Sequence, residues 1–256
     1  MKPISYQLYS SRNYPALADT FSMLGQLGYK QVEGFGGLFT ESTDIGKIKA
    51  GLDANGLHMP TCHFGLDMVR DQPDTVIAHA RALDTEVVFV PAVPPEQRVQ
   101  SAAGWDALGK TLAEIGKPLQ DAGIKFGWHN HAFEFAAIDS AQLPLEHILA
   151  GDDSLLLEFD VAWCVVAGQD PVKWIERYAD RLISAHIKDI APEGECVDED
   201  GWADVGHGTL DWPALLKVLD NTAMQYQIME HDNPNDHQRF ARRSIDTVKS
   251  ILNSPA

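Results

Sequence analysis

Short apolar segments alternate with helically spaced segments along the whole 256-residue chain. Eight of the short segments have the length and composition of β-strands, and they cover residues 4–9, 31–35, 59–64, 87–90, 125–131, 155–161, 182–187 and 226–230. The segments between them space apolar residues along one helix face, as Leu17, Phe21 and Leu24 do. Alternating strands and helices form parallel sheets, and eight such units predict a closed (β/α)8 TIM barrel, an α/β fold of about 250 residues.

An open, doubly wound sheet is the alternative fold. Its nucleotide-binding forms carry GxGxxG after the first strand, and no such run follows residues 4–9. The glycine-rich stretch at 34–37 comes after the second predicted strand and lacks that spacing, so we expect a loop there. No linker or shift in composition divides the chain, and we expect one domain over residues 1–256.

The charge balance excludes several kinds of partner. The chain has 20 Lys and Arg against 37 Asp and Glu, a formal net charge of −17. Such a chain repels phosphate backbones and anionic membrane surfaces, so we expect neither nucleic acid nor membrane as a partner. The first residues contain no apolar stretch of signal-peptide length, no apolar run is long enough to span a membrane, and the three cysteines show no disulfide pattern. We therefore expect a cytoplasmic protein.

Polar residues end five of the predicted strands. They lie at 62–63, 128–131, 158–160, 186–189 and 230–232, and the active sites of such barrels form at the carboxyl ends of the strands. Residues i and i+2 of a strand share a face. We therefore expect His129 and His131 to lie on one face, and Glu158 and Asp160 likewise. The apolar Trp128 is expected on the outer face, against the helices.

Four of these residues are candidate metal ligands: His129, Asp160, His186 and Glu230. A single buried histidine is usually a hydrogen-bonded core residue, but burying all four together without a cation or substrate is costly. Imidazole nitrogens and carboxylate oxygens suit a divalent ion. We expect Mn²⁺, with Zn²⁺, Co²⁺, Mg²⁺ and Fe²⁺ as alternatives.

Five motifs, in this order and on these strands, resemble a known family. They are FGWHNHAFEF at 126–135, LLEFDVAW at 156–163, AHIKD at 185–189, GHGTLDW at 206–212 and MEHD at 229–232. The chain resembles the xylose isomerase-like TIM-barrel superfamily over essentially its whole length. That superfamily includes tagatose 3-epimerase-like and inosose dehydratase-like enzymes, hydroxypyruvate isomerases and, more distantly, endonuclease IV.

The resemblance implies one divalent ion held by Glu, Asp, His and Glu from strands five to eight. Asp160, His186 and Glu230 match the last three of these ligands. At the first position the chain has His129, and Glu134 is an alternative fourth ligand. In the epimerases that first Glu is also one of two opposed bases. Its absence argues against a two-base epimerase and in favour of lyase chemistry. For a lyase, the HNH-type branch of the superfamily is the better analogy.

The chemistry of this site predicts proton abstraction next to a carbonyl through a metal-stabilised enediolate. Our candidates for the base and acid are Glu134, His131 and Glu230. Lys188 would stabilise a developing oxyanion, or alternatively pair with Glu158. The resulting hypothesis is a sugar isomerase or epimerase acting on a ketose or keto-sugar. The alternative is a lyase or dehydratase acting on a keto-sugar, a keto-glycoside or an inositol derivative.

Other residues are candidates for binding a small-molecule sugar, and each has a purely structural alternative: His63, Glu33, Trp163 and His207. The acidic run 193–201 is either a solvated loop or a lid that excludes anions. Without an arginine cluster at the strand ends, we expect a neutral sugar rather than a sugar phosphate.

Two further roles are alternatives to an enzyme of this kind. The net charge of −17 and the small number of candidate ligands argue against an endonuclease, and a non-catalytic sugar-binding role is the remaining alternative. Family members are often dimers or tetramers, but no surface stripe in this sequence defines an interface.

Overall fold

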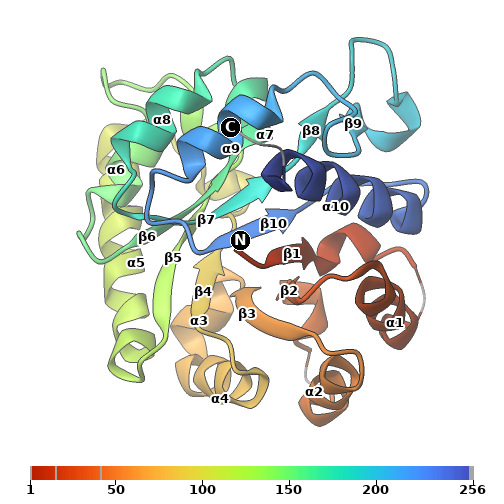
Figure 1. The fold of residues 1–256 in the computed structure, drawn as a ribbon. Helices are drawn as coiled ribbons and strands as arrows, with labels where there is room; N and C mark the ends of the chain where they lie inside the picture. Colours follow the sequence, from red (N-terminus) through yellow and green to blue (C-terminus); the bar gives the residue numbers. More distant parts are fainter. Residues whose placement is uncertain (1, 15, 41, 254–256) are drawn as a thin grey trace.

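Eight parallel strands close into a barrel in the order β1-β10-β7-β6-β5-β4-β3-β2 (Figure 1). The computed structural model describes residues 2–14, 16–40 and 42–253. The barrel strands are β1 (Ile4–Gln7), β2 (Gln31–Gly34), β3 (His58–His63), β4 (Val87–Val90), β5 (Lys125–His129), β6 (Leu156–Asp160), β7 (Leu182–Ile187) and β10 (Tyr226–Met229). Each lies within or beside a predicted strand. The predicted TIM barrel is therefore confirmed, and the open-sheet alternative is wrong.

Helices form the outer layer, and Figure 1 shows the first and last of them, α1 and α10, side by side. The α-helices are α1 (Leu17–Leu27), α2 (Ile45–Ala54), α3 (Leu66–Asp71), α4 (Pro73–Leu83), α5 (Ala102–Asp121), α6 (Pro144–Leu149), α7 (Val161–Val166), α8 (Pro171–Arg177), α9 (Trp212–Leu219) and α10 (His237–Asn253). Short 3-10 helices lie in the loops at Leu8–Ser11, Gly36–Leu38, Pro95–Gln97, Phe133–Phe135 and Val197–Glu199. Within the described residues, no helix is long and apolar enough to cross a membrane.

A register shift between β6 and β7 decides which β7 side chains face the barrel interior. Leu157 pairs with Leu182, but the next residue, Glu158, pairs with Ser184. The extra residue in β7 is a β-bulge, which changes the side chains that follow from one face to the other. It therefore aligns Ser184 and His186 with Glu158 and Asp160 of β6. A second shift, between β2 and β3, pairs Glu33 with Thr61.

The core has two parts. Residues that face outward from the strands, such as Trp128, Phe159 and Ile187, are buried in the main hydrophobic cluster between the barrel and its helices. A smaller cluster contains Val87, Phe89, Ile183, Tyr226 and Ile228. These residues alternate with the outward-facing ones, so they fill the barrel interior away from the carboxyl ends. The interior at the carboxyl ends is left to polar residues.

Residues after β7 form an excursion outside the barrel, with β8 (Asp189–Ile190) paired antiparallel to β9 (Trp202–Ala203). The buried carboxylate of Asp189 accepts hydrogen bonds from the backbone N–H groups of Ile190, Gly206, Gly208 and Leu210. It therefore fixes the turn at 206–210, because four backbone donors share one carboxylate.

Candidate active site

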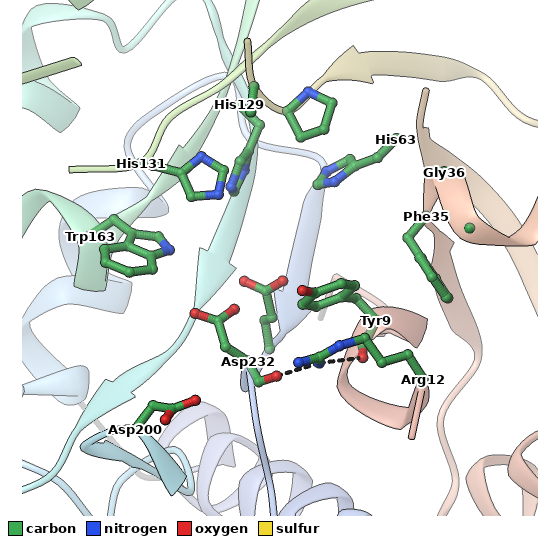
Figure 2. A pocket seen from close by; sticks show the side chains of 14 residues that line it. Tyr9, Arg12, Phe35, Gly36, His63, His129, His131, Trp163, Asp200 and Asp232 are labelled. Carbon is green, nitrogen blue, oxygen red and sulfur yellow. Dashed lines mark hydrogen bonds between the residues drawn. The ribbon is translucent and has the colours of Figure 1, made fainter. Parts of the chain in front are cut away.

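A cavity of about 520 Å³ opens at the carboxyl ends of the barrel strands (Figure 2). Figure 2 shows His63, His129 and His131 along one side and Asp232 across from them. The lining residues are Tyr9, Arg12, Phe35, Gly36, Gly37, His63, Pro91, Ala92, His129, His131, Trp163, Asp200, Glu230 and Asp232. The volume is in the range of small-molecule sites, and aromatic rings alternate with ionisable groups around it.

Asp160 and His186 meet Glu230, which lines this cavity. Asp160 is the last residue of β6, His186 is the second-last of β7 and Glu230 follows β10, and each offers a ligand atom within 4.8 Å of the others. His186 Nδ1 lies 2.8 Å from Glu230 Oε2 and 3.8 Å from Asp160 Oδ2. Asp160 Oδ1 accepts a hydrogen bond from Trp163 N, which caps α7. That cap fixes the carboxylate and leaves Oδ2 directed at the other two ligands.

A second group, the His63 group, shares the ring of His186. It consists of His63, His129, Glu158 and His186, all buried and with ligand atoms within 4.8 Å of one another. Glu158 Oε2 lies 3.2 Å from both His129 Nδ1 and His186 Nε2. Glu158 Oε1 accepts a hydrogen bond from Ser184. The structure therefore brings His129 into the His63 group and not into the group of Asp160 and Glu230.

A buried polar atom of Asp160 indicates that these residues suit a cation. Asp160 Oδ2 is buried and makes no hydrogen bond with any described residue, and Glu33 Oε2 beside His186 is in the same situation. Buried polar atoms are almost always paired, so such orphans need an explanation. A divalent ion would supply the missing interaction, and a set of carboxylate oxygens and imidazole nitrogens is the usual protein environment for Mn²⁺ or Zn²⁺.

Lys188 carries its ammonium group into the same region. Its Nζ lies 2.5 Å from Asp232 Oδ2, 3.6 Å from Glu230 Oε2 and 4.0 Å from Asp160 Oδ2. The side chain is completely buried, so these carboxylates are the reason that the charge is tolerated. Among the side chains described, the partner of Lys188 is thus Asp232, and the alternative pairing with Glu158 is wrong.

The three histidines that line the cavity have unlike proton affinities. Burial would lower the pKa of His63, but the carboxylates of Glu33 and Glu158 raise it to about 10. Burial and the neighbouring charge of His186 lower the pKa of His129 to about 3. Burial likewise holds the pKa of His131 well below its ordinary value. At neutral pH His129 and His131 are therefore neutral imidazoles, able to accept or donate a proton at a ring nitrogen.

Glu134 is turned away from this chemistry. Its Oε1 accepts a hydrogen bond from Trp128 Nε1 and its Oε2 one from the backbone N–H of His131. Trp128 faces the outer layer, so the carboxylate is held behind the cavity wall. It is buried, and burial raises its pKa well above the ordinary value. Both ligand groups form without Glu134.

The predicted sugar-binding residues are divided between the cavity and its surroundings. His63 and Trp163 line the cavity. Glu33 lies beneath it, where its Oε1 is 2.8 Å from His186 Nε2 and accepts a hydrogen bond from Gln7. His207 is exposed on the turn held by Asp189, outside the cavity lining.

Sequence reasoning missed several residues of the site. Glu158 was expected on the same face as Asp160, two residues on, but it was not among the candidate ligands. Tyr9, Arg12 and Phe35 follow β1 and β2, and nothing in their local sequence marks them. Arg12 packs on the Tyr9 ring, with its guanidinium carbon 3.8 Å from the ring centroid, and donates a hydrogen bond to the backbone oxygen of Asp232.

The family described as xylose isomerase-like TIM barrel matches residues 21–251. Curated relatives include an inosose dehydratase of Clostridium beijerinckii, 26% identical over 161 residues, which are 55% of this chain and 53% of that protein. Another is the rhizopine catabolism protein MocC of Rhizobium meliloti, 27% identical over 46% of this chain and 39% of that protein. The matches span about half, or less, of these relatives' lengths.

Solved structures match almost the full chain. A sugar phosphate isomerase/epimerase from Parabacteroides distasonis superposes with a TM-score of 0.81 at 20% identity, covering 97% of this chain and 94% of that one. The IOLI protein, solved with a bound zinc atom, has a TM-score of 0.76 at 14% identity and 98% coverage of both chains. At these identities the likeness shows the shared fold.

Proposed function

Because the chain belongs to the xylose isomerase-like TIM barrel family, we propose that it is a divalent-metal-dependent sugar isomerase or epimerase. In this proposal it removes a proton from the carbon next to the carbonyl group of a ketose or keto-sugar. The observation that carries the proposal is the convergence of Asp160, His186 and Glu230 at the base of a cavity. Most catalytic metal sites of this kind have three protein ligands and keep a position for substrate.

Asp160 Oδ2, His186 Nδ1 and Glu230 would hold the ion. Mn²⁺ is our first choice, because carboxylates supply two of the three ligands. When bound, the ion would polarise the substrate carbonyl and stabilise the negative charge that develops on its oxygen. Lys188 lies 3.6 Å from Glu230 and adds a second positive charge at the same place.

Glu33 supports this arrangement from behind. Histidines that bind a metal usually donate their other ring N–H to a carboxylate, which fixes the tautomer and the ring orientation. His186 Nε2 lies 2.8 Å from Glu33 Oε1, so Nδ1, once it has lost its proton, would direct its lone pair toward an ion held by Asp160 and Glu230. The His63 group would then serve to hold His186.

Proton transfer needs groups on both sides of the substrate. Glu230 and the neutral imidazole of His131 both line the cavity. Glu230 would take the proton, and His131 would deliver one to the neighbouring atom or to the opposite face. An imidazole that is neutral at pH 7 can serve in either direction. Trp163 and Phe35 would exclude water from the sugar.

A lyase or dehydratase is the second candidate, and two observations favour it. Glu134 is held by Trp128 and His131 behind the wall and is absent from the described lining of the cavity, so it is not available as a second base. The matched relatives also include inosose dehydratases. In that case His131 would protonate a departing hydroxyl group instead of a carbon atom.

Proton exchange with solvent tests the proposal. The Mn²⁺-loaded protein is incubated in deuterium oxide with a panel of free ketoses and keto-sugars, and products are followed by NMR. We expect deuterium at the carbon next to the carbonyl, and its loss on EDTA treatment and in Asp160→Asn. Recovery of an isomer supports the first candidate, while loss of water or of a substituent supports the second. Exchange that persists in both EDTA and Asp160→Asn would contradict the metal-dependent chemistry.

A further inference from the structure

A second hollow, of about 690 Å³, adjoins the active-site cavity. The two share Trp163, Asp200 and Asp232 as lining residues. Figure 2 shows these three on the side of the cavity away from Phe35. A molecule bound in the cavity can therefore extend past Trp163 into the hollow.

The hollow is lined by apolar side chains that the fold leaves exposed. Val166, at the end of α7, is 50% exposed and Val197 is 73% exposed, and both line it. Within the described residues, Val99 is the other large hydrophobic side chain with high exposure, and it lies outside both pockets. Isolated exposed valines are common, but two that face one hollow beside an active site indicate a binding surface.

An aromatic wall joins the hollow to the reacting groups. The Trp163 and Trp202 rings meet edge to face with centroids 4.8 Å apart, and both line the hollow. Lys188 Nζ lies 4.8 Å and 4.0 Å from the two ring centroids, within the range of a cation–π interaction. The ammonium group that pairs with Asp232 therefore also holds the two indoles in place.

The loop that carries Val197 is anchored. The buried Glu199 carboxylate accepts hydrogen bonds from Arg239 and from the backbone N–H of Asn235, which belong to α10 and the segment before it. The loop contains the short 3-10 helix Val197–Glu199, and Cys196 and Asp200 flank this helix at φ values of 49° and 59°. This left-handed conformation is uncommon for residues other than glycine. The exposure of Val197 therefore belongs to a defined conformation.

Acidic side chains around the hollow restrict the charge of its occupant. Glu193, Glu195, Asp200 and Asp232 all contribute to its lining. An anionic group would be repelled, whereas a neutral planar ring can pack on the indoles and valines.

We propose that the hollow binds a neutral aromatic group joined to the sugar that reacts in the adjoining cavity. The substrate is then an aryl conjugate of a keto-sugar, such as an aryl keto-glycoside. That the substrate contains a keto-sugar rests on the proposed function. That it carries an aromatic group rests on the hollow itself.

Binding of unreactive probes tests the inference. The p-nitrophenyl and methyl D-glucopyranosides, in both anomeric forms, are titrated into the protein, with tryptophan fluorescence and calorimetry as readouts. We expect the p-nitrophenyl compound to bind about tenfold more tightly than the methyl compound, because the ring removes apolar surface from water, and to quench tryptophan emission. The preference should fall below about threefold in Val166→Asp and Val197→Asp, since a carboxylate there opposes apolar burial. It should be retained in Val99→Asp, the matched control.

Three results would overturn the inference: equal binding of the two compounds, no binding of the p-nitrophenyl compound at ~1 mM, or a preference unchanged in the two hollow variants. Sedimentation velocity on the same variants identifies the competing occupant, because a change of oligomeric state without a change of preference would assign the hollow to a second copy of the chain. The titration is repeated with Asp160→Asn to separate the two proposals. If Asp160→Asn keeps the preference for the p-nitrophenyl compound while the parent protein shows no deuterium exchange, the proposed function is contradicted and the inference about the hollow is not.

Discussion

His186 Nε2 lies 2.8 Å from Glu33 Oε1, a contact that joins β7 to β2 across the interior of the barrel. The same imidazole presents Nδ1 to Glu230 at 2.8 Å. One ring thus stands between the group of Asp160 and Glu230 and the His63 group, and it belongs to both. This division underlies the account of the site, and each side of it leads to a different prediction.

Glu33→Gln should weaken the binding of Mn²⁺ by about 10–100-fold, the usual effect of removing the partner that orients a metal-binding histidine. The amide keeps the shape of the side chain but loses the charge that favours the Nε2–H tautomer of His186. Glu86→Gln is the control, because Glu86 accepts a hydrogen bond from Tyr226 outside both ligand groups. Calorimetric titration of the metal-free proteins measures the change, and equal affinities in the two variants would contradict the assignment of Glu33.

Lys188→Met should destabilise the metal-free protein by about 3–5 kcal/mol, the usual effect of removing one member of a buried ion pair. Asp160, Glu230 and Asp232 would lose the cation that faces them. Saturating Mn²⁺ should reduce this loss, because the ion supplies positive charge to two of the same carboxylates. Urea unfolding with and without Mn²⁺ measures both values.

Lys49→Met is the matched control for Lys188→Met. Lys49 is at the surface and pairs with Asp53 and Asp84, so its loss should change the free energy of unfolding little. A loss in Lys188→Met that is the same with and without Mn²⁺ would show that the ion and the ammonium group do not share partners.

Metal binding should release about one proton per ion near pH 7. Burial would lower the pKa of His186, but the charges of Glu230 and Glu158 raise it well above its ordinary value, so the metal-free ring is protonated at neutral pH. Ligation through Nδ1 requires that proton to leave, and the apparent affinity should therefore rise with pH by up to about tenfold per unit. Calorimetry in buffers of different ionisation enthalpy measures the release. Heats that do not depend on the buffer would contradict it.

Gly208→Ala should lower the stability of the protein by about 1–3 kcal/mol, the usual effect of overpacking. A Cβ atom at this position would lie 2.3 Å from Asp189 Oδ1 and 2.4 Å from the Ile190 carbonyl oxygen, in the centre of the turn that Asp189 holds. Gly65→Ala is the control, because no described heavy atom beyond its chain neighbours lies within 4 Å of the added methyl group. Thermal unfolding compares the two variants, and an equal change in both would remove the argument for a closely packed turn.

The sequence predicted the barrel because its eight strands carry a strong local signal, namely short apolar runs between helices with regular spacing. It also predicted that Asp160, His186 and Glu230 would meet, since each ends a strand. The register shift that turns Ser184 and His186 inward is different, because an extra residue in β7 changes the face of every residue after it. Period-two reasoning expected His186 and Lys188 on the inner face, opposite the apolar Ile187, but it did not predict the register shift that places them there.

Side-chain contacts explain the remaining differences. Glu134 was a candidate base because it follows β5, yet its carboxylate is held by Trp128, six residues earlier and on the outer face. Glu33 was a candidate for sugar binding, and it lies instead against His186, 153 residues away. Neither partnership has a sequence signal. The first depends on how the chain turns after β5, and the second on the closed barrel, which brings β2 and β7 to a common interior.

In the proposed site, Asp160, His186 and Glu230 hold one divalent ion at the base of the cavity. Anomalous diffraction from crystals grown with Mn²⁺ tests it most directly. We predict one peak at ~2.0–2.3 Å from Asp160 Oδ2, His186 Nδ1 and a Glu230 oxygen, and no peak in Asp160→Asn. A peak among His63, His129 and Glu158 instead, or no peak in the parent protein, would contradict the claim.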